Sequence, residues 1–302
     1  MRALILGGAG MLGHRLWQVL RARPDTYVTL RRPFATYATF NLFDASRTIA
    51  ELDATNEADL DRAFDLAQPE VVYNCVGIVK QRDDARDAVQ SISINALLPH
   101  RLAARCRESG ARLVHVSTDC VFSGSRGRYT EQDTPDATDL YGRSKLLGEV
   151  VAPGSVTIRT SMIGRELSGR RGLVEWFRSQ HGTAVRGFTR AVFSGFTTAE
   201  LARILIDVGE RRPDLVGLWH ASAEPISKFQ LLLMLNDAMG LGTRIEPDSS
   251  FECDRSLEST PFRQATGYAP PSWQAMVDEL AHDTSPYDLR MNSWTSMANT
   301  SS

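Results

Sequence analysis

The feature that most constrains the fold of this chain is a glycine-rich turn close to its N-terminus. In "RALILGGAGMLG", Gly7, Gly10 and Gly13 follow a short apolar run, and the next stretch, "HRLWQVLRAR", has apolar residues at helical spacing. Glycine permits a tight turn and a close approach of backbone to a ligand, and the free N–H groups that begin a helix bind phosphate. With Met11 and Leu12 completing the turn, this order of strand, turn and helix predicts a dinucleotide site. The alternative is a turn that only joins the strand to the helix.

Strand and helix patterns alternate through the following residues. "YVTLRR", "EVVYNCVG", "ARLVHVSTD" and "VTIRTS" have the composition of strands, and segments with helical periodicity separate them. The strands are apolar on both faces, which is typical of a parallel sheet covered by helices on both sides. We therefore expect an α/β protein with a Rossmann-type doubly wound parallel sheet.

The regular alternation weakens after residue 161, which predicts a second, smaller and discontinuous substrate-binding domain. We expect the dinucleotide-binding domain to comprise residues 1–162 and 192–222, and the substrate-binding domain to comprise residues 163–191 and 223–283. Residues 284–302 are polar and have no periodic pattern, so we expect a mobile tail there.

Composition restricts the class of protein and of partner. The net charge is −2 over 302 residues, so no basic surface indicates nucleic-acid binding. No apolar run approaches the roughly 20 residues that cross a bilayer, and a first strand beginning at Arg2 leaves no room for a signal peptide. The four cysteines are scattered without a C-x-x-C pair, so we expect reduced thiols, no metal site and a cytoplasmic location.

The end of the second predicted strand bears on the choice of cofactor. A carboxylate there favours NAD, whereas a basic residue favours the 2′-phosphate of NADP. This strand ends with Arg31 and Arg32 and has no carboxylate, and guanidinium groups suit a phosphate. We therefore expect NADP(H), with NAD(H) as the alternative; two solvated surface arginines are the competing interpretation. Asp53 is a candidate for binding the adenine, or else a turn or cap residue.

A tyrosine and a lysine one helical turn apart are the candidate catalytic pair. The chain has only three lysines among its 34 basic residues, and Lys145 follows Tyr141 by four positions in "DLYGRSKLLGE". Residues at this spacing share one helix face. A nearby ammonium favours the ionised phenol and lowers its pKa from about 10, so we expect Tyr141 to exchange protons with a carbonyl–alcohol pair. A chance occurrence of the pair is the alternative.

Hydroxyl groups are expected beside this pair. Ser117 and Thr118 stand at the carboxyl end of the strand "ARLVHVSTD", and open α/β sheets bind their ligands at that edge. A hydroxyl at this place is suited to donate a hydrogen bond to the carbonyl oxygen that the tyrosine protonates. We therefore expect Thr118 in catalysis and Ser117 in substrate binding.

Taken together, "GGAGMLG", "STDCVFSG" and "YGRSKLLGE" resemble the extended short-chain dehydrogenase/reductases, and most of all the dTDP-4-dehydrorhamnose reductase group of nucleotide-sugar reductases. The resemblance covers about residues 1–283. It implies an NADPH-binding Rossmann domain and a smaller domain that closes on a nucleotide sugar. It also implies that Thr118 binds the keto oxygen, that Tyr141 is the acid, and that Lys145 holds the nicotinamide ribose. Asn95 matches a position where such reductases carry an active-site or structural asparagine; a polar residue at a helix kink is the alternative.

The chain departs from the family pattern at two places. Cys120 stands where a tyrosine commonly follows the Thr-Asp pair, which puts the identity of the sugar in doubt. Lys80 lies in "NCVGIVKQ", where the family is usually rich in alanine, and is a candidate contact to cofactor or substrate or else a solvated loop residue. Arg186, Arg255 and Arg263 are candidate contacts to the diphosphate, with a solvated surface position as the alternative for each.

The resemblance predicts hydride transfer from NADPH to C4 of a 4-keto-6-deoxyhexose linked to dTDP or UDP. Many members of the family form homodimers. An epimerase or dehydratase of the same superfamily, which retains NAD and recycles the hydride, is the first alternative. The second is a catalytically silent NADP-binding subunit, like the regulatory subunit of methionine adenosyltransferase. The basic pair Arg31 and Arg32 favours the reductase over the epimerase.

Overall fold

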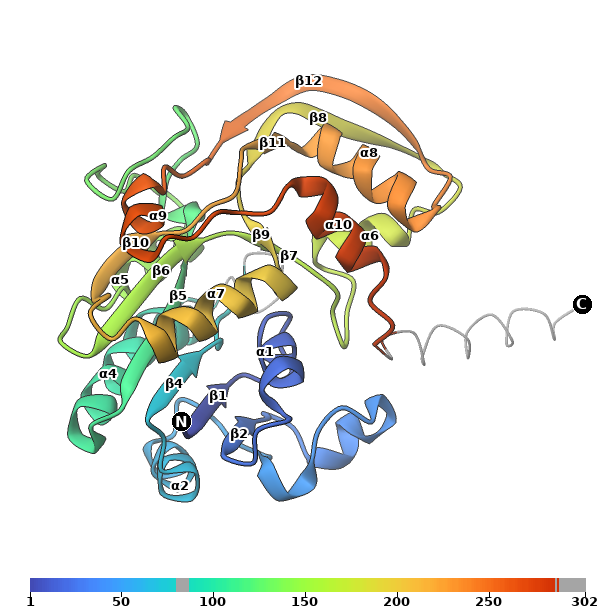
Figure 1. Ribbon diagram of the computed structural model, residues 1–302. Coiled ribbons are helices and arrows are strands. Elements are labelled where there is room, and N and C mark those ends of the chain that lie inside the picture. Colours follow the sequence, from blue (N-terminus) through green and yellow to red (C-terminus); the bar gives the residue numbers. More distant parts are fainter. Residues whose placement is uncertain (80–86, 286, 288–302) are drawn as a thin grey trace, which may run out of the picture.

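A seven-stranded parallel sheet forms the larger part of the molecule in the computed structural model, which describes residues 1–79, 87–285 and 287 (Figure 1). The strands lie in the order β10 (Gly217–His220), β6 (Ser155–Thr160), β5 (Arg112–Thr118), β4 (Val71–Asn74), β1 (Ala3–Leu6), β2 (Thr26–Thr29) and β3 (Thr48–Ile49). Every pairing in this sheet is parallel. The chain leaves β1 in one direction to β2 and β3 and in the other to β4, so the order reverses between β1 and β4. This is the Rossmann arrangement that the sequence predicts.

Helices cover both faces of this sheet. The longer ones are α1 (Gly13–Leu20), α2 (Glu57–Ala67), α4 (Leu98–Ser109), α5 (Leu140–Leu147) and α7 (Thr198–Arg211). Shorter helical segments are α3 (Ala88–Ser91), the π-helix η4 (Ile92–Leu97), and the 3-10 turns η1 (Phe34–Phe40), η2 (Ala45–Arg47) and η5 (Asp119–Val121).

The alternation of side chains along each strand separates two apolar cores. Ile5 of β1 packs into the core that contains the apolar residues of α1 and α7, whereas Leu4 and Leu6 pack with α2 and α4. Successive side chains of a strand point to opposite faces, so a strand that is apolar at every position supplies both cores at once. The continuous apolar runs in the sequence follow from this requirement.

A second unit is built from segments that interrupt the sheet-forming part of the chain. Its strands are β8 (Ala184–Phe193), β11 (Ile226–Ser227) and β12 (Arg244–Asp254), and β7 (Met162–Ile163) pairs with β9 (Phe196–Thr197). The accompanying helices are α6 (Leu173–Arg178), α8 (Lys228–Met239) and α10 (Trp273–Ala281), whereas α9 (Thr260–Thr266) lies against β10 of the main sheet. In Figure 1, β8, β12 and α8 form an arch at the top of the view, while β10 belongs to the main sheet below it and α7 packs against that sheet.

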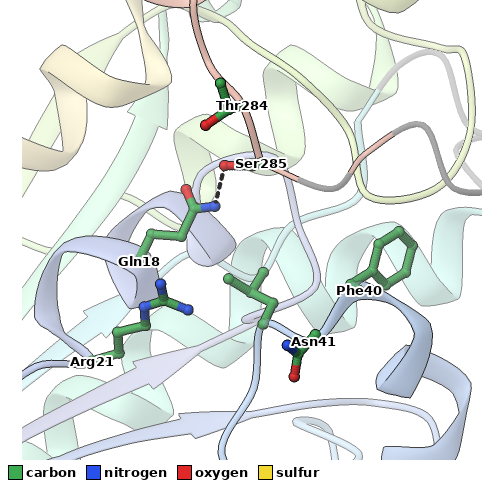
Figure 2. Close-up of a pocket in the computed structure, with 7 residues that line it drawn as sticks. Gln18, Arg21, Phe40, Asn41, Thr284 and Ser285 are labelled. Carbon is green, nitrogen blue, oxygen red and sulfur yellow. Dashed lines mark hydrogen bonds between the residues drawn. The ribbon is translucent and has the colours of Figure 1, made fainter.

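The residues that follow α10 return to α1. The sequence predicts a mobile tail from Thr284, but Tyr287 is only 7% exposed and Ser285 accepts a 2.7 Å hydrogen bond from Gln18 of α1 (Figure 2). A pocket of about 380 Å³ lies between these segments; it is lined by Gln18, Arg21, Phe40, Asn41, Leu42, Thr284 and Ser285. None of these lining residues belongs to the predicted catalytic set. Residues 286 and 288–302 lie outside the described part of the chain.

No helix among residues 1–79, 87–285 and 287 combines the length and the apolar character that a bilayer span requires.

Candidate active site

The glycine turn has the close packing that a phosphate cradle requires. Gly7 has φ +83° and donates its N–H to the Thr29 hydroxyl at 3.1 Å, and the N–H of Gly10 bonds the oxygen of Gly7 at 3.0 Å. A Cβ atom at Gly13 would lie 2.2 Å from that oxygen of Gly7. The turn also touches Cys75, the residue after β4, so it stands where the strand order reverses and where such sheets bind dinucleotides.

Met11 and Leu12 differ in what they offer to a ligand at this turn. Leu12 is 4% exposed and packs into the core, so only its backbone is available to a cofactor. Met11 is half-buried, and its Cε atom lies close to Gly172 of the second unit. Met11 therefore extends from the glycine turn toward that unit.

Arg31 and Arg32 lie just beyond the carboxyl end of β2 and are exposed, next to Tyr37 of η1. Asp53 accepts hydrogen bonds at 2.9 and 2.8 Å from the N–H and the hydroxyl of Thr55. The structure therefore shows Asp53 in the turn that precedes α2, which is the alternative that the sequence left open; contact with adenine stays a prediction.

Tyr141 and Lys145 both belong to α5, which begins after Asp139, whose side chain accepts a hydrogen bond from the N–H of Gly142. The Lys145 side chain is buried, and its Nζ donates a 2.7 Å hydrogen bond to the Val116 carbonyl of β5. A Cβ atom at Gly142 would lie 2.3 Å from the oxygen of Cys120. Glycine at this position therefore lets α5 approach the turn that follows β5.

The pKa of Tyr141 moves in the direction opposite to the one the sequence suggests. Burial raises it above its ordinary value of 10, with Cys120 and Asp119 acting in the same direction, while a hydrogen bond with Thr118 acts against them. Burial also disfavours the charged form of Lys145, and it lowers the pKa of this side chain to about 8. The prediction of a phenol made acidic by Lys145 is therefore wrong, because desolvation disfavours the charged phenolate. Tyr141 holds its proton at neutral pH.

Thr118 ends β5 and lies beside Tyr141. Its Oγ accepts a 3.1 Å hydrogen bond from the N–H of Cys120, and its hydroxyl donates to Asp119 Oδ1 at 3.2 Å. Thr118 also caps the short turn η5, which fixes its side chain. The structure thus brings Thr118 together with Tyr141, as the sequence predicts for two parts of one site.

The structure corrects the expectation for Ser117. Its hydroxyl donates a 2.7 Å hydrogen bond to Glu149, and Glu149 forms a two-pronged ion pair with Arg159. Ser117 and Thr118 are consecutive in a strand and so point to opposite faces of the sheet. Ser117 therefore belongs to a buried ionic network and is turned away from Thr118.

The second unit contributes two cations beside η5, the turn that follows β5. Arg255 donates to the Phe122 carbonyl at 2.8 Å, and its Nη1 lies 3.7 Å from Cys120 Sγ. Lys228, the first residue of α8, is within electrostatic range of Asp119 and Cys120 and lies over the Phe193 ring. Arg255 and Cys120 are among the site residues predicted from the sequence, whereas Lys228 is not. Its one available signal was the rarity of lysine in the chain.

Two of the three candidate arginines have partners elsewhere. Arg186 forms a 3.1 Å ion pair with Asp248 and is 72% exposed, so it is a surface residue of the β8–β12 pair. Arg263 donates to the Ser222 carbonyl at 3.1 Å and pairs with Glu224. The contacts described for these two arginines do not involve the turn η5 after β5. Arg186 is exposed, as the surface alternative expects, whereas Arg263 is half-buried, and a diphosphate contact stays a prediction for both. Lys80 lies outside the described residues.

Asn95 has a structural position within the π-helix η4. Its side chain forms hydrogen bonds with both backbone groups of Ile78, at 2.9 and 3.0 Å, and donates to the Ser144 hydroxyl of α5 at 3.2 Å. A Cβ atom at Gly148 would lie 1.9 Å from the backbone oxygen of Asn95. Asn95 therefore joins the segment after β4 to α5. Among the described residues, no group of three or more His, Cys, Asp or Glu side chains is placed to hold a metal ion.

The parallel sheet, the glycine turn at its switch point and the Thr118, Tyr141 and Lys145 set define an oxidoreductase of the extended short-chain dehydrogenase/reductase class. Within that class, the model of the RmlD substrate binding domain family matches residues 1–285, so the chain belongs to this family.

Relatives with full-length similarity carry two different functional names. The chain is 25% identical to dTDP-4-dehydrorhamnose reductase of Aggregatibacter actinomycetemcomitans over 92% of its own length and 98% of the relative. It is also 25% identical to methionine adenosyltransferase 2 subunit beta of Danio rerio, over 87% of its own length and 88% of the relative. Among solved structures, dTDP-4-dehydrorhamnose reductase of Bacillus anthracis in complex with NADP aligns with a TM-score of 0.76 at 22% identity, covering 94% and 99% of the two chains.

Proposed function

We propose that this protein reduces a keto group, at C4, of a nucleotide-linked 4-keto-6-deoxyhexose with NADPH as the hydride donor. The observation that carries the proposal is the gathering of the Tyr141 phenol, the Thr118 hydroxyl and the buried Lys145 ammonium around the carboxyl end of β5. The glycine turn stands at the switch point of the same sheet. Family membership and the relatives named dTDP-4-dehydrorhamnose reductase support the substrate class.

The residues present fit a dinucleotide. Glycine at position 13 lets the turn pack closely, since a Cβ atom there would lie 2.2 Å from the Gly7 oxygen, and the first N–H groups of α1 are suited to a pyrophosphate. Arg31 and Arg32 supply exposed guanidinium groups for a 2′-phosphate. Lys145 would hold the nicotinamide ribose with its ammonium protons. When bound, NADPH supplies the hydride.

The chain's own groups supply a proton and hydrogen bonds to the reacting oxygen. Tyr141 keeps its proton, because burial raises its pKa, so its phenol is ready to donate as the alkoxide develops. The Thr118 hydroxyl, now directed to Asp119 at 3.2 Å, rotates to donate to the same oxygen. Lys145 then stabilises the phenolate that remains. Arg255 and Lys228 place positive charge where an anionic substrate enters.

Turnover of defined substrates tests this proposal. The purified chain is mixed with NADPH and with dTDP- or UDP-4-keto-6-deoxyhexose, and the absorbance of NADPH is followed. We expect stoichiometric oxidation of NADPH with formation of a hydroxyl at C4. An isomerised sugar without net consumption of NADPH would instead identify an epimerase. Arg255→Ala should raise the KM for the nucleotide sugar and leave the KM for NADPH unchanged.

A second candidate is a regulatory subunit that binds NADP and has no activity of its own. The full-length similarity to methionine adenosyltransferase 2 subunit beta favours it. Size-exclusion chromatography of the chain with a methionine adenosyltransferase catalytic subunit, with and without NADPH, separates the two candidates. A stable complex together with no keto-sugar turnover would replace the reductase assignment.

A further inference from the structure

Glu149 lies eight residues after Tyr141 and four after Lys145, in the turn that ends α5. We propose that Glu149 is a positioning residue of the active site, which fixes the strand end carrying Thr118 and holds Lys145 in its ammonium form. The inference rests on the proposed reductase function, because it concerns the residues assigned to that reaction. It assigns to Glu149 a role beyond the catalytic set of Thr118, Tyr141 and Lys145.

The geometry around Glu149 is a closed, buried ionic network. Its Oε1 accepts from the Ser117 hydroxyl and from Arg159 Nε, both at 2.7 Å, and its Oε2 accepts from Arg159 Nη2 at 2.7 Å. The side chains of Arg159 and Glu149 are only 3% and 6% exposed. Arg159 in turn contacts His220 Nε2 at 3.2 Å. Two parallel N–H···O bonds fix the orientation of the carboxylate as well as its position.

This network holds the strand end that carries Thr118. Ser117 and Arg159 are register partners in the parallel pair β5–β6, and Glu149 bridges their side chains on one face. Thr118 is the next residue and projects from the opposite face. Anchoring Ser117 therefore restricts the backbone from which the Thr118 hydroxyl projects toward Tyr141.

The same carboxylate acts on the charge of Lys145. The ionisable groups that interact with Lys145 are Glu149 from the turn that ends its helix, Cys75 from the segment after β4, and His115 from β5. Burial lowers the pKa of Lys145 to about 8, and the charge of Glu149 is the largest of the influences that raise it. The neutral thiol of Cys75 and the buried His115, whose own pKa burial lowers, carry no charge near neutral pH. Glu149 is thus the anion that supports a buried ammonium.

A purely structural ion pair is the alternative, since a buried pair by itself is weak evidence for a functional role. The two roles differ in how activity depends on pH. Loss of a structural anchor lowers activity by the same factor at every pH, whereas loss of the charge lowers the pKa of Lys145. The alkaline limit of activity would then move to lower pH.

The experiment compares pH profiles of kcat and kcat/KM for the full-length wild type, Glu149→Gln and Glu149→Asp. In Glu149→Gln we expect the alkaline limb to move down by about one pH unit. The rate should then fall about tenfold near pH 9 but little near pH 6. Glu149→Asp keeps the charge and should return the limb toward that of the wild type. An unmoved limb in Glu149→Gln, or a loss of equal size at every pH, would overturn the proposal.

Glu149→Gln leaves Arg159 buried without its anion, so this variant risks poor folding. The double variant Glu149→Gln with Arg159→Met removes both charges, and replacement of a buried pair in this way is often tolerated. We expect it to regain thermal stability while keeping the lowered alkaline limb. A double variant that is stable and has the wild-type limb would also refute the role of Glu149.

A matched control comes from the second unit. Glu175 forms a similarly buried pair with Arg165, with side-chain exposures of 9% and 7%. Glu175→Gln should lower the melting temperature and leave the alkaline limb in place. A limb that moved in this control as well would show that any broken buried pair has the same effect, and would remove the support for Glu149.

A readout that needs no sugar separates this inference from the proposed function. NADPH binding, followed by fluorescence over the same pH range, depends on the Lys145 ammonium, and its alkaline limit should shift in Glu149→Gln as it does for turnover. A wild type that binds NADPH but reduces no keto sugar would count against the proposed function alone. Identical pH dependence of NADPH binding in wild type and Glu149→Gln would count against Glu149 alone.

Discussion

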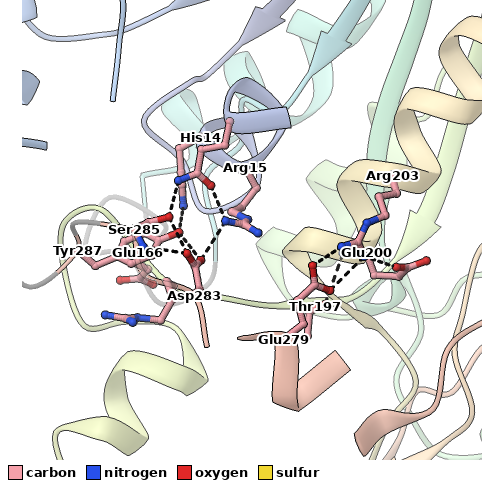
Figure 3. A network of polar contacts seen from close by, with 12 residues as sticks. His14, Arg15, Glu166, Thr197, Glu200, Arg203, Glu279, Asp283, Ser285 and Tyr287 are labelled. Carbon is pink, nitrogen blue, oxygen red and sulfur yellow. Dashed lines mark hydrogen bonds and ion pairs between the residues drawn. The ribbon is translucent and has the colours of Figure 1, made fainter. Parts of the chain in front are cut away.

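The Nε2 atom of His14 lies 2.9 Å from the phenol oxygen of Tyr287, across 273 positions of sequence. The other ring nitrogen of His14 is 2.8 Å from the oxygen of Gly10 and must donate to it, because a carbonyl only accepts. One buried imidazole therefore joins the glycine turn to the segment after α10. Figure 3 shows Asp283, Ser285 and Tyr287 of that segment around His14, with Asp283 also paired to Arg15 at 3.0 Å.

The contact between His14 and Tyr287 predicts that the last described residues stabilise the protein. Tyr287→Phe removes only the hydroxyl, which leaves the buried Nε2 of His14 without this partner and Asp283 without a 3.0 Å hydrogen bond. This should lower the free energy of unfolding by about 1–3 kcal/mol. Denaturant unfolding measures this value. Tyr27→Phe, at a half-buried tyrosine of β2, is the control and should change it by less than about 0.5 kcal/mol. Equal effects of the two variants would argue against the contact.

His14 also predicts how stability depends on pH. Burial lowers its pKa from 6.5 to about 4, so between these values the unfolded chain binds a proton that the folded chain does not. Stability contributed by this group is complete above about pH 6.5 and is lost as the pH falls toward 4, by up to about 3 kcal/mol. His220, whose pKa burial also lowers to about 4, acts in the same window. Denaturant unfolding across this range should show a slope that decreases in His14→Asn. An unchanged slope would contradict the assignment.

Gly13→Ala tests the packing of the glycine turn. The new methyl group would lie 2.2 Å from the oxygen of Gly7, so the turn must shift and NADPH binding should weaken by at least about tenfold, since a displaced turn loses its phosphate contacts. Gly77→Ala is the comparison, because its nearest described neighbour lies at an ordinary 3.5 Å. Isothermal titration with NADPH measures both affinities. Full-strength binding in Gly13→Ala would show that this turn does not hold the cofactor.

Replacement of Arg31 and Arg32 by alanine tests the preference for NADP. Both arginines are exposed beyond β2, so their removal should leave the fold intact. Each lost charged hydrogen bond to a 2′-phosphate is worth about 1.5–3 kcal/mol, so the affinity for NADPH should fall at least about tenfold while that for NADH stays level. Titration of both cofactors against wild type and double variant gives the ratio. An equal loss for both would mean that the arginines act elsewhere.

Tyr141→Phe tests the acid of the proposed reaction. The variant keeps the ring and loses the hydroxyl that Thr118 contacts, so kcat should fall by about 10²–10⁴-fold while NADPH binding stays near that of the wild type. Steady-state turnover and a cofactor titration measure the two quantities. A kcat close to that of the wild type would refute a catalytic role for this phenol.

Local patterns in the sequence determined the parts of the fold that depend on few neighbours. The glycine turn, the strands that are apolar on both faces, and the spacing of Tyr141 and Lys145 were all predicted from the sequence. Each follows from the geometry of one strand, turn or helix. The direction of side chains repeats every two residues in a strand and every 3.6 residues in a helix. The parallel Rossmann sheet followed from the same alternation.

Only the tertiary structure decided which side chains face one another across elements. It turned Ser117 to Glu149 and Arg159, placed Lys228 of the second unit beside Asp119, and joined Tyr287 to His14. It also raised the pKa of Tyr141, because burial in the assembled site removes the solvent that stabilises a phenolate. Desolvation and contacts between distant residues depend on how elements pack, and the spacing of residues within one element does not encode them.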